Sequence, residues 1–223
     1  TNTDAIIIGS LMILVPGLLF TNAMRDIIFG DTNSGVNRIV QVLLIAVAIA
    51  LGTAAGRLFA DYIFVLNYNT IPTQNLYTIQ CLASFVGCIG FFILFNIHGP
   101  GGFLCALGGM LAWAVYCLTY HFTNNDLLSN LMAAITAAAY SEIMARVRKY
   151  PAISYLVVSI FPLLPGAGIY YTINALIQSN MEAFTETGIH TIAIAGVLAV
   201  GILIVSTSVR SWTQWRRDKK ASV

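Results

Sequence analysis

Residues 14–23 read LVPGLLFTNA, and residues 163–172 read LLPGAGIYYT. Each segment places a Pro-Gly pair near the middle of an apolar run that is long enough to cross a membrane. Because a proline inside a helix removes a backbone hydrogen bond, both runs predict a span that is broken near its midpoint. A break that recurs at the same depth in two spans predicts an internal repeat.

The composition assigns the chain to a broad class. Of its 223 residues, 58% are hydrophobic and 9% are charged, whereas globular proteins have about 45–50% and about 25%. So few charged residues cannot cover a soluble surface, which excludes a soluble enzyme, a nucleic-acid-binding protein and a disordered chain. The sequence therefore predicts an all-α polytopic membrane protein.

Seven apolar runs predict seven transmembrane helices, because a helix needs about 20 residues to cross the hydrocarbon core. The predicted spans are 5–28, 37–60, 76–97, 102–122, 127–146, 153–178 and 188–210. The last two helices of a first repeat are assigned to 1–65, the five helices of a second repeat to 75–210, and a basic tail to 211–223.

The basic residues predict the orientation. Of the 11 Lys and Arg residues, all but Arg57 lie beside the linkers after spans one and five or in the tail. Since basic residues gather on the cytoplasmic side, the C-terminus is predicted to be cytoplasmic and Thr1 external.

The two broken spans are five crossings apart, so two repeats that contain them run in opposite directions through the membrane. In each repeat a glycine, Gly35 or Gly188, opens the unbroken span, and aligning these glycines pairs Ile39 with Ile192. Inverted repeats with helices broken at corresponding places are typical of secondary transporters, whose site lies near the midplane. The alternative is that Pro-Gly only kinks two packing helices, which membrane helices tolerate.

The segment from Pro16-Gly17 through Asn22-Ala23, Arg25-Asp26, Gly30-Asp31 and Ser34-Gly35 resembles the end of the first domain of the bacterial threonine/serine exporter family. The remainder, from about residue 75 through residues 162–166 (PLLPG) to Ser206, resembles that family's second, five-helix domain.

The resemblance implies a ten-helix, secondary-active exporter of threonine and serine in the bacterial inner membrane. Some relatives are split across two polypeptides, and two-subunit relatives are associated with dicarboxylate export. Counted from the Pro-Gly pair, the first repeat has nothing before its broken helix, so an N-terminal three-helix portion or a companion subunit is the expected partner. A dicarboxylate exporter, a channel subunit and a non-transporting scaffold are the alternatives, and a homo-oligomer stays open.

The Pro-Gly breaks also predict where a small substrate binds. A proline at the first position of a helix costs nothing, so each break starts a half-helix whose free N–H groups attract an anion such as a carboxylate. Nearby amide, hydroxyl and phenol groups suit an amino group and a hydroxyl, although they suit interhelical hydrogen bonds equally. The predicted substrate-binding residues are Pro16, Gly17, Thr21, Asn22, Pro165, Gly166, Tyr170, Tyr171 and Asn174.

Charged residues near the span ends are predicted to gate or couple transport. Arg25 and Asp26, with Asp31 or Arg38, suit an inner gate whose ion pairs rearrange, or else an interfacial anchor and a solvated pair. Glu142 has Arg146 one turn later as its predicted partner, either as a structural ion pair or as a proton relay.

No catalytic or cofactor motif is found. The four cysteines lie inside apolar runs without a CxxC spacing, and the three histidines have no grouped carboxylate or cysteine. The chain is therefore predicted to be no enzyme and to need no metal and no cofactor.

Overall fold

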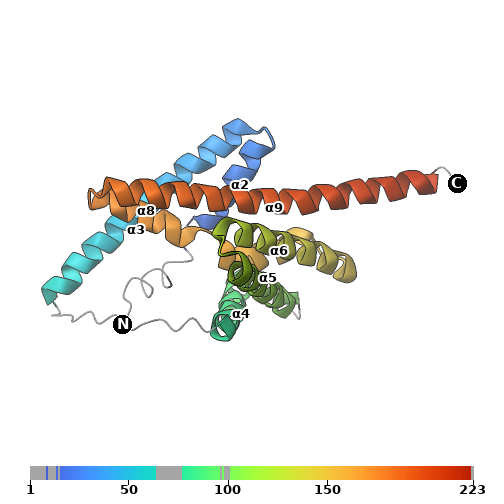
Figure 1. Cartoon of the computed structure of the whole chain (residues 1–223), viewed down its shortest axis with the longest axis horizontal. Coiled ribbons are helices and arrows are strands. Elements are labelled where there is room, and N and C mark those ends of the chain that lie inside the picture. The colour runs from blue at the N-terminus through green and yellow to red at the C-terminus, as the bar shows by residue number, and fades with distance from the viewer. Residues whose placement is uncertain are drawn as a thin grey trace. The chain divides into compact units, whose positions relative to one another are not determined.

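The computed structural model describes residues 9, 14, 16–63, 77–95, 97 and 101–221, and in these ranges every regular element is a helix (Figure 1). The elements are α2 (Gly17–Ile28), α3 (Thr32–Ile63), α4 (Tyr77–Leu94), α5 (Gly101–Thr123), α6 (Asp126–Arg148), α7 (Ala152–Ile160), the short 3₁₀ helix η1 (Phe161–Leu163), α8 (Gly166–Ile177) and α9 (Met181–Ala221). The all-helical prediction is confirmed for this part of the chain.

Five of the described helices are each long and apolar enough to cross a membrane, and α7 with η1 and α8, bent by 48°, counts as a sixth if the pair is one span. The predicted break of span 153–178 is therefore confirmed, and it lies at Leu164 and Pro165. The predicted span 5–28 lies partly outside the described residues, so the count of seven stays a prediction.

Two helices extend well beyond the predicted apolar runs. α3 begins at Thr32 rather than at 37, and α9 begins at Met181 rather than at 188 and continues into the basic tail. Hydropathy marks only the apolar part of a helix. The first turn of α3 is polar and is capped by Asp31, which accepts from the Ser34 N–H. The ends of α9 contain Glu, Gln, Lys and Arg, which are good helix formers. The linker predicted at 179–187 is in fact a tight turn followed by the first turns of α9.

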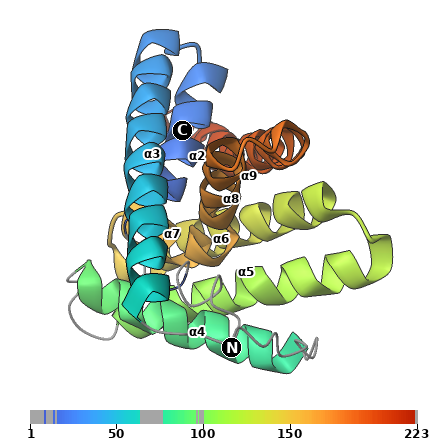
Figure 2. The same cartoon turned by 90° about the vertical axis from the view of Figure 1, so that its left-hand side faces the viewer.

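The described helices divide into two compact units. The first contains α2, α3, α8 and α9 up to Ala195, and the second contains α4 to α7, η1 and α9 from Gly196. Within the first unit, α2 and α3 form an antiparallel hairpin (Figure 2). The candidate site residues beside both Pro-Gly pairs belong to this unit.

Small residues and buried side-chain hydrogen bonds hold the second unit together. α5 packs against α4, α6 and α7, and a Cβ atom at Gly108 would clash with the Ser159 hydroxyl of α7. The Tyr140 hydroxyl of α6 donates to the Leu104 carbonyl at 2.7 Å, and the Ser159 hydroxyl donates to the Cys105 carbonyl at 3.2 Å. These bonds satisfy polar groups that lipid could not.

Candidate functional site

The two Pro-Gly pairs start two helices with the same backbone geometry. Pro16 (φ −81°, ψ 39°) precedes the 12-residue helix α2, and Pro165 (φ −77°, ψ 43°) precedes the 12-residue helix α8. The Pro16 carbonyl accepts the first helical bond from Phe20 at 2.9 Å, and the Pro165 carbonyl accepts that of Ile169 at 3.2 Å. Each proline is thus the N-cap residue rather than the first helical residue that was predicted, because its ψ lies outside the helical range.

Both helix starts are buried and lack a capping side chain. The proline and the glycine of each pair are buried, and neither proline offers a side-chain cap. The first N–H groups of α2 and α8 therefore have no intrahelical acceptor and carry the positive end of the helix dipole. A carboxylate is a suitable partner for such groups.

The turns that follow these helices share one hydrogen-bond pattern. In the connection between α2 and α3, the N–H groups of residues 29, 30 and 31 donate to the carbonyls of residues 25, 27 and 26, each at 3.0 Å. In the connection between α8 and α9, the N–H groups of residues 178, 179 and 180 donate in the same way to the carbonyls of residues 174, 176 and 175, at 2.9–3.0 Å. The side chains of Asp31 and Asn180 then cap α3 and α9, accepting from residues 34 and 183.

One shift of numbering therefore relates the hairpin α2–α3 to the hairpin formed by α8 and the start of α9. The shift is 149, the difference between Pro16 and Pro165, and it carries Gly35 onto Phe184. The predicted pairing of Gly35 with Gly188 is offset by one helical turn from the register that the turn hydrogen bonds set. Most matched positions share their burial, and six pairs are buried in both hairpins: Pro16 and Pro165, Gly17 and Gly166, Phe20 and Ile169, Thr21 and Tyr170, Val42 and Thr191, and Ala46 and Ala195.

Thr21 is the most unusual of the predicted substrate-binding residues. Its side chain is 1% exposed, and its hydroxyl has no hydrogen-bond partner among the residues that the structure describes. Threonines elsewhere, such as Thr136 and Thr172, donate to the carbonyl one turn earlier at 2.7–2.8 Å. Because an unpaired buried hydroxyl costs about 1–3 kcal/mol, Thr21 would gain from a bound partner, and it is the one predicted substrate-binding residue among the described residues in this state.

The other predicted substrate-binding residues of α2 and α8 differ in how far their side chains are exposed. Tyr170 is buried, whereas Tyr171 is 40% exposed, and the two rings meet edge to face at 5.6 Å. Asn22 and Asn174 are partly buried. At matched positions, Thr21 pairs with Tyr170 and Asn22 with Tyr171, so hydroxyl, amide and phenol groups follow both helix starts.

The predicted gating residues of the first hairpin form a charged cluster at its turn. The carboxylate of Asp26 lies 2.9 Å from Arg38 of α3 and 4.0 Å from Arg25. Arg38 is thus the partner of Asp26, whereas Asp31 caps α3 through the N–H of Ser34 at 3.3 Å. The ion pair ties the end of α2 to the first turns of α3.

Glu142 and Arg146 form the predicted ion pair within α6, at 3.3 Å. The arginine also donates to the Glu142 carbonyl at 3.0 Å. Their side chains are 24% and 44% exposed, so the pair lies at the edge of the second unit.

A cavity of about 310 Å³ lies between the two hairpins of the first unit. Ten of the residues that line the cavity form five pairs related by the shift of 149, so both hairpins contribute side chains from the same five positions. The pairs are Phe20 and Ile169, Met24 and Ile173, Ile39 and Gly188, Val42 and Thr191, and Leu43 and Ile192. Thr172 and Phe184 complete the lining.

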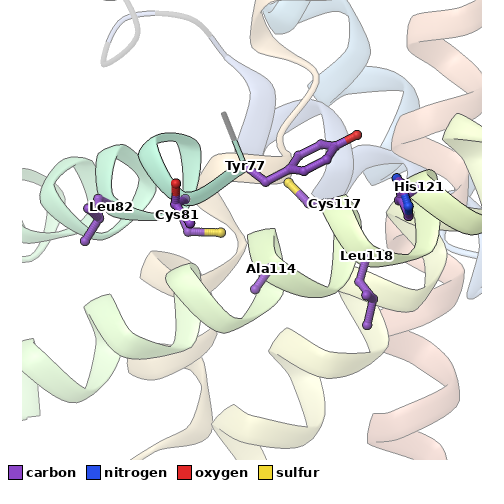
Figure 3. Close-up of a pocket in the computed structure, with 8 residues that line it drawn as sticks. Tyr77, Cys81, Leu82, Ala114, Cys117, Leu118 and His121 are labelled. Atoms are coloured by element: carbon purple, nitrogen blue, oxygen red, sulfur yellow. The ribbon is translucent and has the colours of Figure 1, made fainter. Parts of the chain in front are cut away.

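A second cavity, of about 570 Å³, lies between α4 and α5 of the second unit (Figure 3). Cys81 of α4 and Cys117 of α5 line it, and the Tyr77 ring packs edge to face on His121 at 6.1 Å. Within the described ranges no group of three metal-ligating side chains occurs. None of the predicted site residues lies in this cavity.

One polar cluster was not among the predicted site residues. The Tyr116 hydroxyl of α5 donates to Asp126 of α6 at 2.7 Å, and Asn130 donates to the same carboxylate at 3.1 Å. The Trp113 indole stacks on Tyr116 at 4.8 Å, and its N–H is buried without a partner. The spacing of Asp126 and Asn130, one turn apart, was the only signal in the sequence; the contact with α5 depends on tertiary packing.

Comparison with known families places this geometry in context. The family model described as "Threonine/Serine exporter, ThrE" matches residues 80–208, and the one described as "Putative threonine/serine exporter" matches residues 1–59. The chain belongs to the threonine/serine exporter family. The family resemblance predicted from the sequence is thereby confirmed, and family membership together with the apolar helices identifies a multi-pass membrane protein of a transporter family. No curated protein and no solved structure gives a significant match.

Proposed function

We propose that the chain is the membrane part of a secondary-active exporter that moves threonine and serine across the bacterial cytoplasmic membrane by alternating access. Family membership supports a transporter. The observation that carries the binding step is the pair of buried, uncapped helix starts at Pro16 and Pro165, with the unpaired hydroxyl of Thr21 close behind one of them.

The proposed chemistry follows from these groups. The free N–H groups of a half-helix bind the substrate carboxylate, and the Thr21 hydroxyl bonds the substrate amino group or side-chain hydroxyl. Two helix starts also suit the two carboxylates of a dicarboxylate, so succinate is the competing substrate. No permanently buried charge is required of the protein in either case.

The matched hairpins support alternating access. They share their turn hydrogen bonds and contribute the same positions to one cavity, as two halves of a repeat would. In the proposal the repeats are inverted, the ion pair of Asp26 with Arg38 is an inner gate, and Glu142 with Arg146 is an ion pair at the cytoplasmic end. Three further helices, on the same polypeptide or on a companion chain, complete the first repeat.

The test is counterflow of labelled threonine, serine and succinate in proteoliposomes, with the upstream three-helix segment present, for the parent and for Thr21→Val. Valine keeps the shape of threonine and removes the hydroxyl. We expect the apparent affinity for the transported solute to fall roughly 5–150-fold, while thermal stability rises or stays unchanged because an unpaired polar group is lost.

Thr136→Val is the matched control, because its hydroxyl is satisfied within α6 at 2.8 Å. It should leave counterflow unchanged. Equal concentration dependence in the parent and in Thr21→Val would remove Thr21 from the site, and the absence of counterflow for all three solutes would reject the proposed function.

A further inference from the structure

α4 and α5 of the second unit pack against each other, and ring contacts at both ends of the pair show that they are antiparallel. At one end, the Tyr77 ring of α4 meets the His121 ring of α5. Cys81 lies four residues after Tyr77, and Cys117 lies four residues before His121. Because residues four apart share one face of a helix, the two cysteines face each other one turn further into the pair.

The side chains of these two cysteines are in contact. Their sulfur atoms point toward each other in Figure 3, and a side-chain hydrogen bond joins them. The Cys117 thiol also donates to Gln80, the neighbour of Cys81 on α4, at 3.6 Å. Both cysteines are free, and both line the cavity of about 570 Å³. Since a disulfide requires two side chains that face each other across a short gap, this pair is placed to form one.

The other two cysteines of α4 and α5 have different surroundings. Cys88 and Cys105 are each 1% exposed, and neither lines the cavity. The Cys88 thiol donates to the Val158 carbonyl of α7 at 3.5 Å. The Cys105 thiol donates to the Ser154 carbonyl of the same helix at 3.7 Å. Both thiols are thus bonded to α7, so this pair is the internal control for the first.

We propose that Cys81 and Cys117 form a reversible dithiol–disulfide site, which a small disulfide oxidises by thiol–disulfide exchange. Cys81 is partly exposed and Cys117 is 5% exposed, so Cys81 reacts first. Its thiolate attacks one sulfur of the small disulfide and releases one thiol. The Cys117 thiolate then attacks the Cys81 sulfur of this mixed disulfide and releases the second thiol. Two electrons pass from the cysteines to the small disulfide, and the two protons end on the released thiols.

The site lies close to one end of each helix. Cys81 is four residues from the start of α4, about 6 Å at 1.5 Å per residue, and Cys117 is six residues from the end of α5, about 9 Å. In the orientation of the proposed function these ends face outward, where the compartment is oxidising. The site depends on that orientation for its oxidant in the cell, and it does not depend on which solute is exported.

The test treats the purified protein in detergent with 2-hydroxyethyl disulfide at mildly alkaline pH, removes the reagent and counts free thiols by gel shift with a maleimide after denaturation. Cys88→Ala/Cys105→Ala keeps the proposed pair, and Cys81→Ala/Cys117→Ala keeps the control pair. We expect the thiol labelling of the first variant to fall by at least about tenfold and to return with dithiothreitol, because the exchange is reversible. The labelling of the second variant should stay unchanged.

Intact mass separates the outcomes, since a mixed disulfide adds the mass of the reagent and an internal bridge does not. A stable mixed disulfide, unchanged labelling of the first variant, or an equal loss in both variants would overturn the proposal. A second measurement uses the chain with all four cysteines. Digestion without reductant should give one linked pair of peptides that contain Cys81 and Cys117, whereas a bridge to any other cysteine, or between two chains, would contradict the site. Counterflow is not a readout here, so this result is separate from that of the transport test.

Discussion

The two hairpins of the first unit have matching backbones but different polar surfaces. Both begin at a buried Pro-Gly pair and turn through the same hydrogen bonds. At matched positions, however, Arg25, Asp26 and Arg38 of the first hairpin are replaced by Asn174, Ala175 and Thr187 of the second. Thr187, at the position of Arg38, lies 3.3 Å from the Thr172 hydroxyl, whereas Arg38 pairs with Asp26. Proline, glycine and caps set the shared backbone, whereas the charged positions differ between the hairpins.

The hairpins also reach close helix packing through different helices. In the first, Gly35 of α3 lies where a Cβ atom would be 3.0 Å from the Ala23 carbonyl of α2. In the second, Gly168 of α8 lies against Thr191 of α9. Gly188 of α9 also lies against Thr172 of α8, so in the second hairpin each helix supplies a close-approach glycine.

The largest expected effect concerns orientation, because labelling from one side of a membrane is all or none. Asn33 and Glu182 are matched, exposed positions at the starts of α3 and α9. If the hairpins are inverted, Glu182→Cys reacts in intact cells with an impermeant thiol reagent. Asn33→Cys reacts only after permeabilisation, since its turn carries the basic residues.

The parent chain, whose four cysteines lie within the spans, gives the background labelling. Labelling of both variants from the same side would show parallel hairpins and would end the transporter interpretation that rests on inversion.

A smaller effect tests the ion pair by giving the first hairpin the residues of the second. Arg38→Thr and Asp26→Ala each leave one charge without its closest partner, and we expect each to cost about 1–2 kcal/mol, because Asp26 is 16% and Arg38 39% exposed. The double variant leaves neither charge unpaired, so thermal unfolding should show most of the stability restored. Counterflow should stay low in all three if the pair is a gate.

Additive losses in the double variant would show that the two side chains are not coupled. Normal counterflow with the double variant would keep the pair as a structural anchor and remove it from gating.

Features that depend on residues close together in the sequence could be predicted from it. The helices and the break at Pro165 were predictable, because hydropathy and proline act locally. Arg146 was predictable as the partner of Glu142, since the two lie one helical turn apart. Whether Asp31 or Arg38 pairs with the charges of Arg25 and Asp26 was left open, because the choice depends on how α2 meets α3.

Other features depended on tertiary packing alone. The unpaired state of the Thr21 hydroxyl, and the contact of Tyr116 with Asp126 across two helices, leave no periodic signal in the sequence. The shift of 149 between the two Pro-Gly pairs can be read from the sequence, but the turn hydrogen bonds were needed to extend it into α3 and α9, and the cavity itself depends on how the helices pack.

The smallest expected effect lies in the turns themselves. The residue that adopts positive φ is Gly30 in the first hairpin, at 91°, and Ser179 in the second, at 58°. Side chains are disfavoured in this region, and more so at 91° than at 58°, so Gly30→Ser should destabilise the protein by about 1–2 kcal/mol. Ser179→Gly should stabilise it by less, about 0.5 kcal/mol, because glycine also gains freedom in the unfolded chain. The stability of Ser179→Asn should lie between that of the parent and that of Ser179→Gly, since asparagine tolerates positive φ.

Thermal midpoints of the purified protein in one detergent give the order of stability of these variants. A gain in stability from Gly30→Ser, or a loss from Ser179→Gly, would show that the two turns do not share the backbone on which the comparison of the hairpins depends.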